Sequence, residues 1–237
     1  MYKKILSVII ILCIMNSFLF SQQKDNSLTA AEKKSGWKLL FDGKKMTGWI
    51  TYKNKTTNSW EIINGALHCK ENETGKTDKR ADLITIGQYD NFELSFEWKI
   101  SKAGNSGVMY HVTEEYDVPY LSGPEYQLID DDGFPGKLEE WQKTGADYAM
   151  HTTTSRPTKP AGEYNLTKII VRGSHVEHWL NGVKVLEFEA WTPDWYERKA
   201  KGKWKDAAGY GMAKKGYICL QDHGSEAWFK NIKIKKL

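Results

Sequence analysis

The sequence lacks several features by which common protein classes are identified. It has only 6 Pro and 3 Cys in 237 residues, too few for a collagen-like chain or a disulfide scaffold. It has no His-x-x-x-His or Glu-x-x-His spacing of metal ligands, no Gly-x-Ser-x-Gly nucleophile turn and no glycine-rich phosphate loop. These absences leave zinc metalloproteases, α/β-hydrolases and nucleotide-binding enzymes without support.

Charge and hydropathy exclude two further classes. The 34 Lys and Arg are interspersed with 30 Asp and Glu, which gives a formal net charge of +4 without any basic block. We therefore expect no nucleic-acid partner. Only one long apolar run is present, so a protein that spans a membrane several times is excluded. Aromatic side chains are abundant, with 10 Trp and 12 Tyr, which argues against a disordered chain.

Residues 1–21 have the pattern of a cleaved secretory signal. Lys3 and Lys4 precede an apolar stretch that is shorter than the roughly 20 residues of a membrane anchor. The small Ser21 suits the position before the cleavage site. The sequence therefore predicts a periplasmic or secreted protein with no membrane attachment after cleavage. Residues 22–35 are polar and are expected to form a flexible lead-in.

Residues 36–237 are predicted to form a single all-β domain. Apolar and polar residues alternate over nine positions from Phe92 to Ile100, which is typical of a strand with one face in a core. Asn181 and Gly182 join two β-rich runs as a type I′ hairpin turn does. About ten such strands with few helical stretches favour an antiparallel β-sandwich or jelly roll over βαβ units. The oligomeric state stays open.

Two cysteines are left after cleavage of the signal, Cys69 and Cys219, and both lie in predicted strands. An oxidising compartment permits one disulfide between them, provided that the strands are adjacent. The alternative is a pair of buried free thiols, and the sequence does not decide between them.

Several polar residues alternate with apolar ones in predicted strands and so face away from the core. They are Glu125 and Gln127 in GPEYQLIDDDG and Gln221 and His223 in GYICLQDHG, with His111 in GNSGVMYHV as a further candidate. If these strands are neighbours, a carboxylate, two amides and one or two imidazoles converge on one sheet surface. Such a surface fits a carbohydrate cleft, although a polar strand residue is ordinarily just a solvated position.

Two long loops, one following residue 129 and the other spanning residues 189–216, are unusually aromatic. Loops of this length in a compact domain are usually functional. Trp141 and Tyr148 in the first and Trp204 in the second would either stack on sugar rings or pin the loops to the domain. We expect most of the loop tryptophans to do the latter.

The run Asp130-Asp131-Asp132-Gly133 resembles a fragment of a calcium-binding loop. It lacks the remaining positions of an EF-hand, so it is interpreted first as a turn and second as a metal site. No metal ligands are assigned, and a divalent metal ion stays open as a cofactor.

Six segments together resemble the 3-keto-disaccharide hydrolase domain family, in the order in which that family has them. They are LFDGKKMTGW (40–49), GNSGVMYHV (104–112), GPEYQLIDD (123–131), TGADYAM (144–150), AGEYNLTKIIVRGSHVEHWLNGVKVLEFE (161–189) and YGMAKKGYICLQDHGSEAWFKNIKI (210–234). The resemblance implies a concanavalin A-like jelly roll, in agreement with the strand pattern. One departure is His111, where the family pattern has Arg.

The resemblance implies hydrolysis of the glycosidic bond in small saccharides whose glucose unit is oxidised at C3. A C3 ketone acidifies the C2 proton, so a base can expel the C1 substituent by elimination before water adds. The polar positions that the resemblance carries over are Glu125, Gln127, Asp130, Tyr148, Gln221, Asp222 and His223.

Together with the aromatic loop residues and His111, these positions are given the following expected roles. Glu125 or His223 is expected to be the C2 base, and Tyr148 or His111 to assist the leaving oxygen or the enolate. Substrate contacts are expected from Gln127, Gln221, His111, Asp130, Trp141 and Trp204.

Two other functions would use the same fold. A non-catalytic carbohydrate-binding module needs aromatic loops but no chemistry. A conventional glucanase normally places two carboxylates on one strand, at Glu-x-Asp-x-Glu or Glu-x-Asp-x-x-Glu spacing. At the Glu-x-Asp-x-Glu spacing the second carboxylate would follow Glu125 at position 129, which is Ile, and this argues against a retaining glucanase of that kind.

Overall fold

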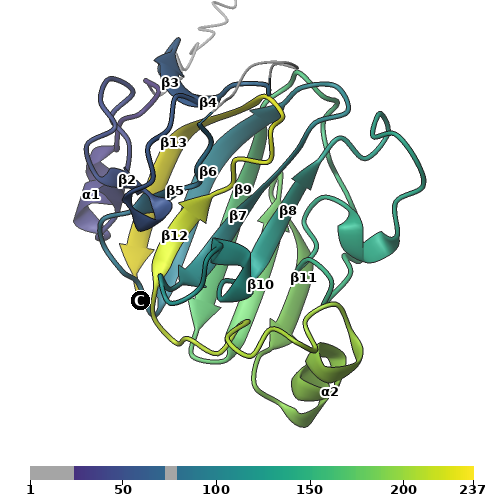
Figure 1. Cartoon of the computed structure of the whole chain (residues 1–237). Helices are drawn as coiled ribbons and strands as arrows, with labels where there is room; N and C mark the ends of the chain where they lie inside the picture. Colours follow the sequence, from purple (N-terminus) through teal and green to yellow (C-terminus); the bar gives the residue numbers. More distant parts are fainter. Residues whose placement is uncertain (1–23, 73–78) are drawn as a thin grey trace, which may run out of the picture.

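Two antiparallel sheets pack face to face in the part of the chain that the structure describes (Figure 1). The structure is a computed structural model, and it describes residues 24–72 and 79–237. The signal expected at residues 1–21 lies outside the described residues. The β-sandwich expected from the strand pattern is confirmed.

The larger sheet has eight strands, in the order β11-β10-β9-β6-β13-β4-β3 with β1 paired to β13. Their bounds are β1 Lys38–Leu39, β3 Trp60–Ile63, β4 Ala66–Cys69, β6 Phe92–Ile100, β9 Asn165–Arg172, β10 His175–Leu180, β11 Val183–Glu189 and β13 Ala227–Lys236. The hairpin predicted at Asn181 and Gly182 joins β10 to β11, and both turn residues have positive φ.

The smaller sheet has five strands in the order β2-β5-β12-β7-β8 and faces the viewer in Figure 1. Their bounds are β2 Trp49–Thr51, β5 Leu83–Thr85, β7 Asn105–Val112, β8 Glu125–Ile129 and β12 Tyr217–Leu220. The three segments that carry the polar candidates belong to β12, β7 and β8, which are consecutive in this sheet. The condition for their convergence is therefore met.

Helix is confined to short pieces. They are the α-helices α1 Ala30–Lys34 and α2 Pro193–Lys201 and the 3₁₀ turns η1 Tyr52–Asn54, η2 Pro119–Leu121 and η3 Glu140–Gln142. The Thr192 hydroxyl caps α2 by accepting the N–H of Trp195 at 3.2 Å. No described helix is long and apolar enough to cross a membrane.

The core between the sheets follows from the alternation within each strand. The inward residues of β6 are Phe92, Leu94, Phe96, Trp98 and Ile100, and they pack against Tyr126 and Leu128 of β8 and Ile218 and Leu220 of β12. Successive residues of a strand point to opposite faces of its sheet. Burial of Tyr126 and Leu128 therefore turns the intervening Gln127 to the outer face.

A bulge in β7 removes one candidate from that outer face. Met109 pairs with Cys219 of β12, and Val112 pairs with Tyr217. Two residues of β7 lie between these two pairs, whereas β12 has only one. His111 lies in this irregular stretch with a φ of 53°, as in a β-bulge. Its buried ring bonds through Nε2 to the backbone oxygen of Asp90 at 2.8 Å. Contrary to the expectation, His111 does not join the polar group on the sheet surface.

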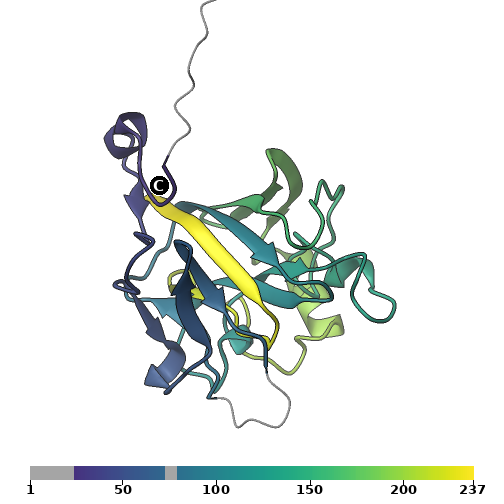
Figure 2. The same ribbon diagram turned by 90° about the horizontal axis from the view of Figure 1, so that it is seen from above.

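Residues 24–35 also differ from the flexible lead-in that was expected. Asn26 and Asn231 of β13 exchange backbone-to-side-chain hydrogen bonds, and Glu32 of α1 forms an ion pair with Lys233. Figure 2 shows this segment beside the C-terminal end of β13. Its polar residues dock it against the larger sheet.

Cys69 and Cys219 are both buried free thiols. Cys69 belongs to the larger sheet and Cys219 to the smaller one. Because the two strands are not neighbours, the condition for a disulfide is not met. The alternative of two buried free thiols is the one found.

Leu94 and Leu166 provide a test of where the core lies. Leu94 of β6 is fully buried, whereas Leu166 of β9 is 45% exposed. We expect Leu94→Ala to lower the free energy of unfolding by about 2–5 kcal/mol, because it leaves a cavity between the sheets. Leu166→Ala is the matched control and should change it by less than about 1 kcal/mol. Urea unfolding measures both, and equal losses would contradict the assignment of the core.

Candidate active site

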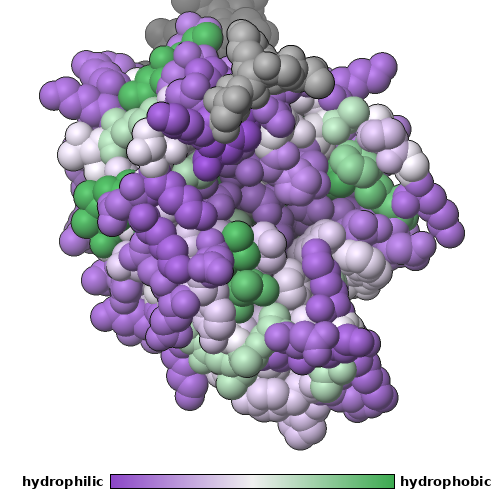
Figure 3. Space-filling view, in the orientation of Figure 1, coloured by the Kyte–Doolittle hydropathy of each residue, from purple (hydrophilic) through white to green (hydrophobic). Residues whose placement is uncertain are grey.

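A cavity of about 270 Å³ opens on the outer face of the five-stranded sheet. It is lined by Asn105, Tyr120, Glu125, Gln127, Tyr148, Lys203, Trp204, Gln221 and His223. Figure 3 shows this side of the molecule, and the middle of it is mostly hydrophilic. The structure thus brings together most of the residues that the sequence analysis singled out.

The register of three neighbouring strands sets the floor of this cavity. Gly107 of β7 pairs with Gln127 of β8, and Gln221 donates its backbone N–H to the Gly107 oxygen at 2.9 Å. These three residues form a row across the sheet. Side chains in such a row share a face. One amide side chain, Gln127 or Gln221, therefore stands on each side of Gly107.

The Glu125 carboxyl lies over Gly107. A Cβ added at Gly107 would come within 2.1 Å of Glu125 Oε1, so only glycine leaves room for the carboxyl in this position. Glu125 is 5% exposed, and burial raises its pKa to about 8, while the charge of Lys203 opposes the rise. The carboxyl is therefore mainly protonated at neutral pH.

Two acceptor oxygens at the cavity lack a partner within the described part of the chain. They are Gln221 Oε1 and Asn105 Oδ1, and both atoms are buried. Gln127 differs, because its Oε1 accepts the backbone N–H of Leu128 at 3.1 Å and leaves its amide NH₂ for a ligand. A buried acceptor without a donor is costly, so the cavity is suited to a ligand that offers hydroxyl groups.

His223 lies at the mouth of the cavity, beside β7. Its Nε2 is 3.3 Å from Nδ2 of Asn105. The residue as a whole is exposed, but partial desolvation of the ring lowers its pKa from the ordinary value. The imidazole is accordingly neutral at neutral pH, with one ring nitrogen able to accept a proton.

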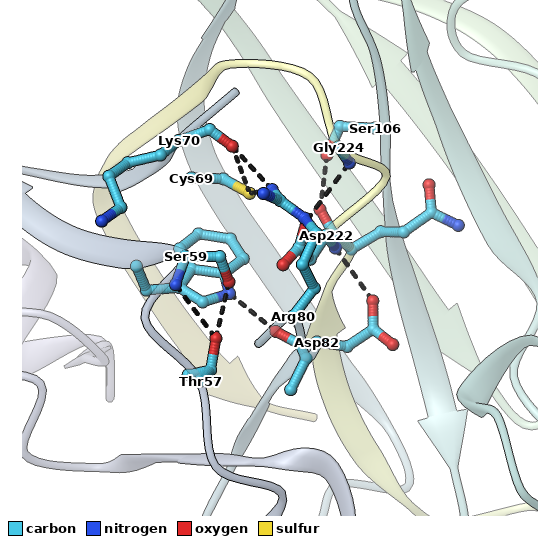
Figure 4. A network of polar contacts seen from close by, with 12 residues as sticks. Thr57, Ser59, Cys69, Lys70, Arg80, Asp82, Ser106, Asp222 and Gly224 are labelled. Atoms are coloured by element: carbon cyan, nitrogen blue, oxygen red, sulfur yellow. Dashed lines mark hydrogen bonds and ion pairs between the residues drawn. The ribbon is translucent and has the colours of Figure 1, made fainter. Parts of the chain in front are cut away.

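A buried ion pair fixes the turn that carries Gln221 and His223 (Figure 4). Arg80 Nε donates to Asp222 Oδ1 at 2.8 Å, and the Asp222 backbone N–H donates to Asp82 Oδ1 at 2.9 Å. Burial raises the pKa of Asp82 to about 6. Asp222 itself points away from the cavity, so it positions its two neighbours and is not a lining residue.

Aromatic residues from two loops form one wall of the cavity. Trp204 is 3% exposed and stacks on Tyr210 with ring centroids 4.2 Å apart. Its Nε1 donates to the backbone oxygen of Tyr148 at 3.0 Å. Tyr148 is tied to the sheet in turn, because its backbone N–H donates to the backbone oxygen of Glu125 at 3.0 Å. The wall and the floor are therefore connected by direct hydrogen bonds.

A buried carboxylate lies next to Tyr148 in the chain and supports this wall. Asp147 accepts the Tyr210 hydroxyl at 3.2 Å and pairs with Nδ1 of His151 at 2.9 Å. The His151 ring stacks on Phe188 of β11 with centroids 4.3 Å apart. This group links the two aromatic loops to the edge of the larger sheet.

Two other expected substrate contacts do not line the cavity. Trp141 packs edge-on behind Tyr148, with ring centroids 5.2 Å apart, and so acts as the loop anchor that the sequence left open. Asp130 accepts the N–H groups of Ala103 at 2.8 Å and Gly133 at 3.1 Å. These bonds match the interpretation of its aspartate run as a turn.

Sequence reasoning missed three lining residues, Asn105, Tyr120 and Lys203. Asn105 had a usable signal, because it is two residues before Gly107 in the same strand and shares its face. Lys203 had none, since it is one of many lysines in a polar loop. Among the described residues one cluster has metal-ligand types close together, His175, Glu177 and Glu187, and it does not line the cavity.

Comparison with known proteins gives matches over most of the chain. A sequence model described as "3-keto-alpha-glucoside-1,2-lyase-like domain" matches residues 36–235. A protein from Bacteroides thetaiotaomicron named "3-keto-disaccharide hydrolase" is 35% identical over 246 aligned positions, which cover 89% of this chain and 84% of the relative.

Solved structures agree with this similarity. A "putative glycosyl hydrolase" from Parabacteroides distasonis superposes with a TM-score of 0.83 at 43% identity, covering 90% of this chain and 100% of its own. A second crystal structure with the same description and organism has a TM-score of 0.63 at 28% identity, covering 85% of this chain and 99% of its own.

The raised pKa of Glu125 predicts how stability depends on pH. The folded protein holds this proton up to about pH 8, whereas an ordinary Glu releases it near 4.5, so wild-type stability falls as pH rises through that window. The Glu125→Gln variant has no carboxyl at this position and does not lose stability in this way. Its free energy of unfolding relative to wild type should increase between pH 5 and pH 8, by up to roughly 1.4 kcal/mol per unit of pKa shift.

Urea unfolding at the two pH values measures this difference, with the exposed Glu163→Gln as control. The control should show no pH-dependent difference from wild type. If the difference in free energy of unfolding between Glu125→Gln and wild type were the same at pH 5 and pH 8, Glu125 would be ionised in the folded protein over this whole range.

Proposed function

The chain belongs to the 3-keto-alpha-glucoside-1,2-lyase-like domain family, and from this premise we propose that it cleaves the glycosidic bond of small saccharides whose glucose ring carries a ketone at C3. It is an enzyme of the glycosidic hydrolase or lyase type. The observation that most supports the finer proposal is a protonated carboxyl, Glu125, and a neutral imidazole, His223, in one cavity.

The first step is removal of the proton at C2. The electron pair of the C2–H bond forms a C2=C3 bond, and the ketone π pair moves onto the C3 oxygen as an enolate. We assign His223 as the base, because its lowered pKa keeps the ring neutral near pH 7. Glu125 is less suited to this role, since its pKa of about 8 leaves it mainly protonated.

The second step expels the group at C1. The enolate re-forms the ketone, the pair from C2=C3 forms C1=C2, and the bond from C1 to the leaving oxygen breaks. That oxygen needs a proton, which the Glu125 carboxyl supplies, and the Tyr148 hydroxyl is available to it as a hydrogen-bond donor. Water then adds at C1 and a proton returns to C2, so that one water is consumed for each bond cleaved.

Substrate orientation is assigned to the amide floor and the aromatic wall. The unpaired oxygens of Gln221 and Asn105 accept sugar hydroxyls, and the Gln127 NH₂ donates to one. Trp204 presents an indole that is fixed by its stack on Tyr210. Aromatic faces pack well against the C–H faces of sugar rings.

A sugar-binding module without chemistry is the second candidate, and the amide floor with its aromatic wall would serve it equally well. It gives no reason, however, for a carboxyl held over a glycine. A conventional retaining glucanase is less well supported, because it uses two carboxyl groups about 5 Å apart. Among the described residues that line the cavity, Glu125 is the one carboxyl.

We also propose that the enzyme acts in the periplasm or outside the cell. The support is the pattern of residues 1–21, with its lysine pair, short apolar stretch and small Ser21. N-terminal sequencing of the protein from the culture and periplasmic fractions of its host would test both the cleavage and the compartment.

Cleavage of 3-keto-trehalose in parallel with trehalose tests the proposed reaction. The protein of residues 22–237 should release glucose and 3-keto-glucose from the first and nothing from the second, because only the ketone acidifies C2. Glu125→Gln and His223→Gln should each lower kcat by about 10²–10⁴-fold. Glu163→Gln and His175→Gln are the matched controls and should keep wild-type rates.

Added EDTA in the same assay reports any need for a divalent metal. Binding of a sugar without cleavage of the keto substrate would favour the binding module. Cleavage of both substrates would contradict the C2 proton route.

The rate of cleavage should depend on pH with a bell shape. It should rise with pH as His223 loses its proton, at a pH below that of an ordinary histidine. It should fall again near pH 8 as Glu125 loses the proton that the leaving oxygen needs. A profile of kcat/KM from pH 4 to pH 10 measures both limbs, and a rate still rising above pH 9 would rule out Glu125 as the acid.

A further inference from the structure

Lys203 contributes a full positive charge to the lining of the cavity, and the reaction proposed above gives that charge no role. It is the only Lys or Arg among the described lining residues. The remaining lining groups are amides, a phenol pair, an indole, an imidazole and a mainly protonated carboxyl. The question is what negative charge this cation meets during the reaction.

The chain fixes the backbone on both sides of Lys203. α2 ends at Lys201, and the N–H of the next residue, Gly202, donates to the backbone oxygen of Arg198 at 2.9 Å. A Cβ added at Gly202 would lie only 2.9 Å from that oxygen. On the other side Trp204 is buried against Tyr210. Lys203 therefore projects from a short, well-anchored link between a helix end and a buried indole.

The ammonium group rests on aromatic rings and not on a carboxylate. Nζ lies 4.3 Å from the ring centroid of Tyr148 and 4.9 Å from that of Trp204. Within residues 24–72 and 79–237, no acidic side chain pairs with it. A cation–π contact holds a lysine loosely at an exposed site, so its charge is available to an anion that forms in the cavity.

We propose that the Lys203 ammonium contacts the C3 oxygen of the substrate and stabilises the negative charge that develops there when the C2 proton is removed. This inference rests on the proposed function. No proton is transferred by Lys203: the C2 proton goes to His223, the electron pair reaches the C3 oxygen, and it returns to the ring when the C1–O bond breaks. Lys203 acts by its charge alone, both while the electron pair moves onto the C3 oxygen and while it moves back into the ring.

The position of Lys203 relative to the other reacting groups agrees with this role. Its charge lowers the pKa of both Glu125 and His223, so it acts electrostatically on the acid and on the base. Stabilisation of a developing oxyanion by a positive charge is among the largest single contributions that an enzyme makes to a rate. Before the C2 proton moves to His223, none of the other described lining groups offers such a charge at neutral pH.

The test compares Lys203→Met, Lys203→Arg and, as matched control, Lys205→Met, which removes a nearby exposed lysine that does not line the cavity. We expect Lys203→Met to lower kcat for 3-keto-trehalose by about 10²–10³-fold. Lys203→Arg keeps the charge and should retain more activity than the methionine variant. Lys205→Met should match wild type, and urea unfolding should show that all three variants fold.

A second measurement isolates enolate formation. In D₂O the enzyme should exchange the C2 hydrogen of 3-keto-glucose for deuterium, which proton NMR follows directly. We expect Lys203→Met to slow this exchange by a similar factor to cleavage, because both require the enolate. Slowed exchange together with lowered kcat supports the inference.

Three outcomes would overturn it. If wild type cleaves the keto substrate and Lys203→Met exchanges C2 at the wild-type rate, Lys203 is not the enolate contact, while the proposed function stands. If Lys203→Met raises only KM, the lysine binds the ground state and does not stabilise the charge. If wild type neither cleaves nor exchanges, the proposed function fails and the role of Lys203 falls with it.

Discussion

In β8 and at the end of β12, each residue that faces the cavity stands beside one that is buried between the sheets. Tyr126 and Leu128 cannot turn outward without exposing core surface, so Gln127 cannot turn inward. A shift of either strand by one residue would exchange the two faces and remove the whole floor of the site. The hydrophobic core therefore holds the polar groups in register, and the chemistry depends on packing that lies on the opposite side of the sheet.

Loops from elsewhere in the chain cover part of the same surface and change the proton affinities of its groups. An open sheet face would leave Glu125 and His223 solvated, with ordinary proton affinities. Beside the aromatic wall, the Glu125 carboxyl is buried and keeps its proton, while the partly desolvated imidazole of His223 at the mouth loses its own more readily. Desolvation, the largest cause for both groups, thus shifts their pKa values in opposite directions, toward a protonated carboxyl and a neutral imidazole at neutral pH. Behind them, Arg80 forms an ion pair with Asp222, and Nδ1 of His151 contacts the carboxyl group of Asp147.

Both aromatic loops are attached at several points, which explains why so few of their rings reach the cavity. Trp195, Trp204 and Tyr210 form a separate buried cluster with Met150. Trp204 serves both purposes, since one part packs in that cluster and another lines the site. The link between α2 and this cluster carries Lys203 into the cavity, so a helix end and a stacked indole decide where the positive charge lies.

The sequence by itself determined the sandwich, the faces of β8 and β12, and the family, because alternation and local motifs are properties of short segments. It therefore identified Glu125, Gln127, Gln221 and His223 as candidates for one surface. Only the tertiary structure decided that β12, β7 and β8 are neighbours, that a bulge withdraws His111, and that Lys203 reaches the site while Asp130 and Trp141 do not. It also decided which of Glu125 and His223 holds a proton, because that depends on desolvation by loops far away in the chain. Pairing order, bulges and burial arise from contacts between distant segments, which no local pattern records.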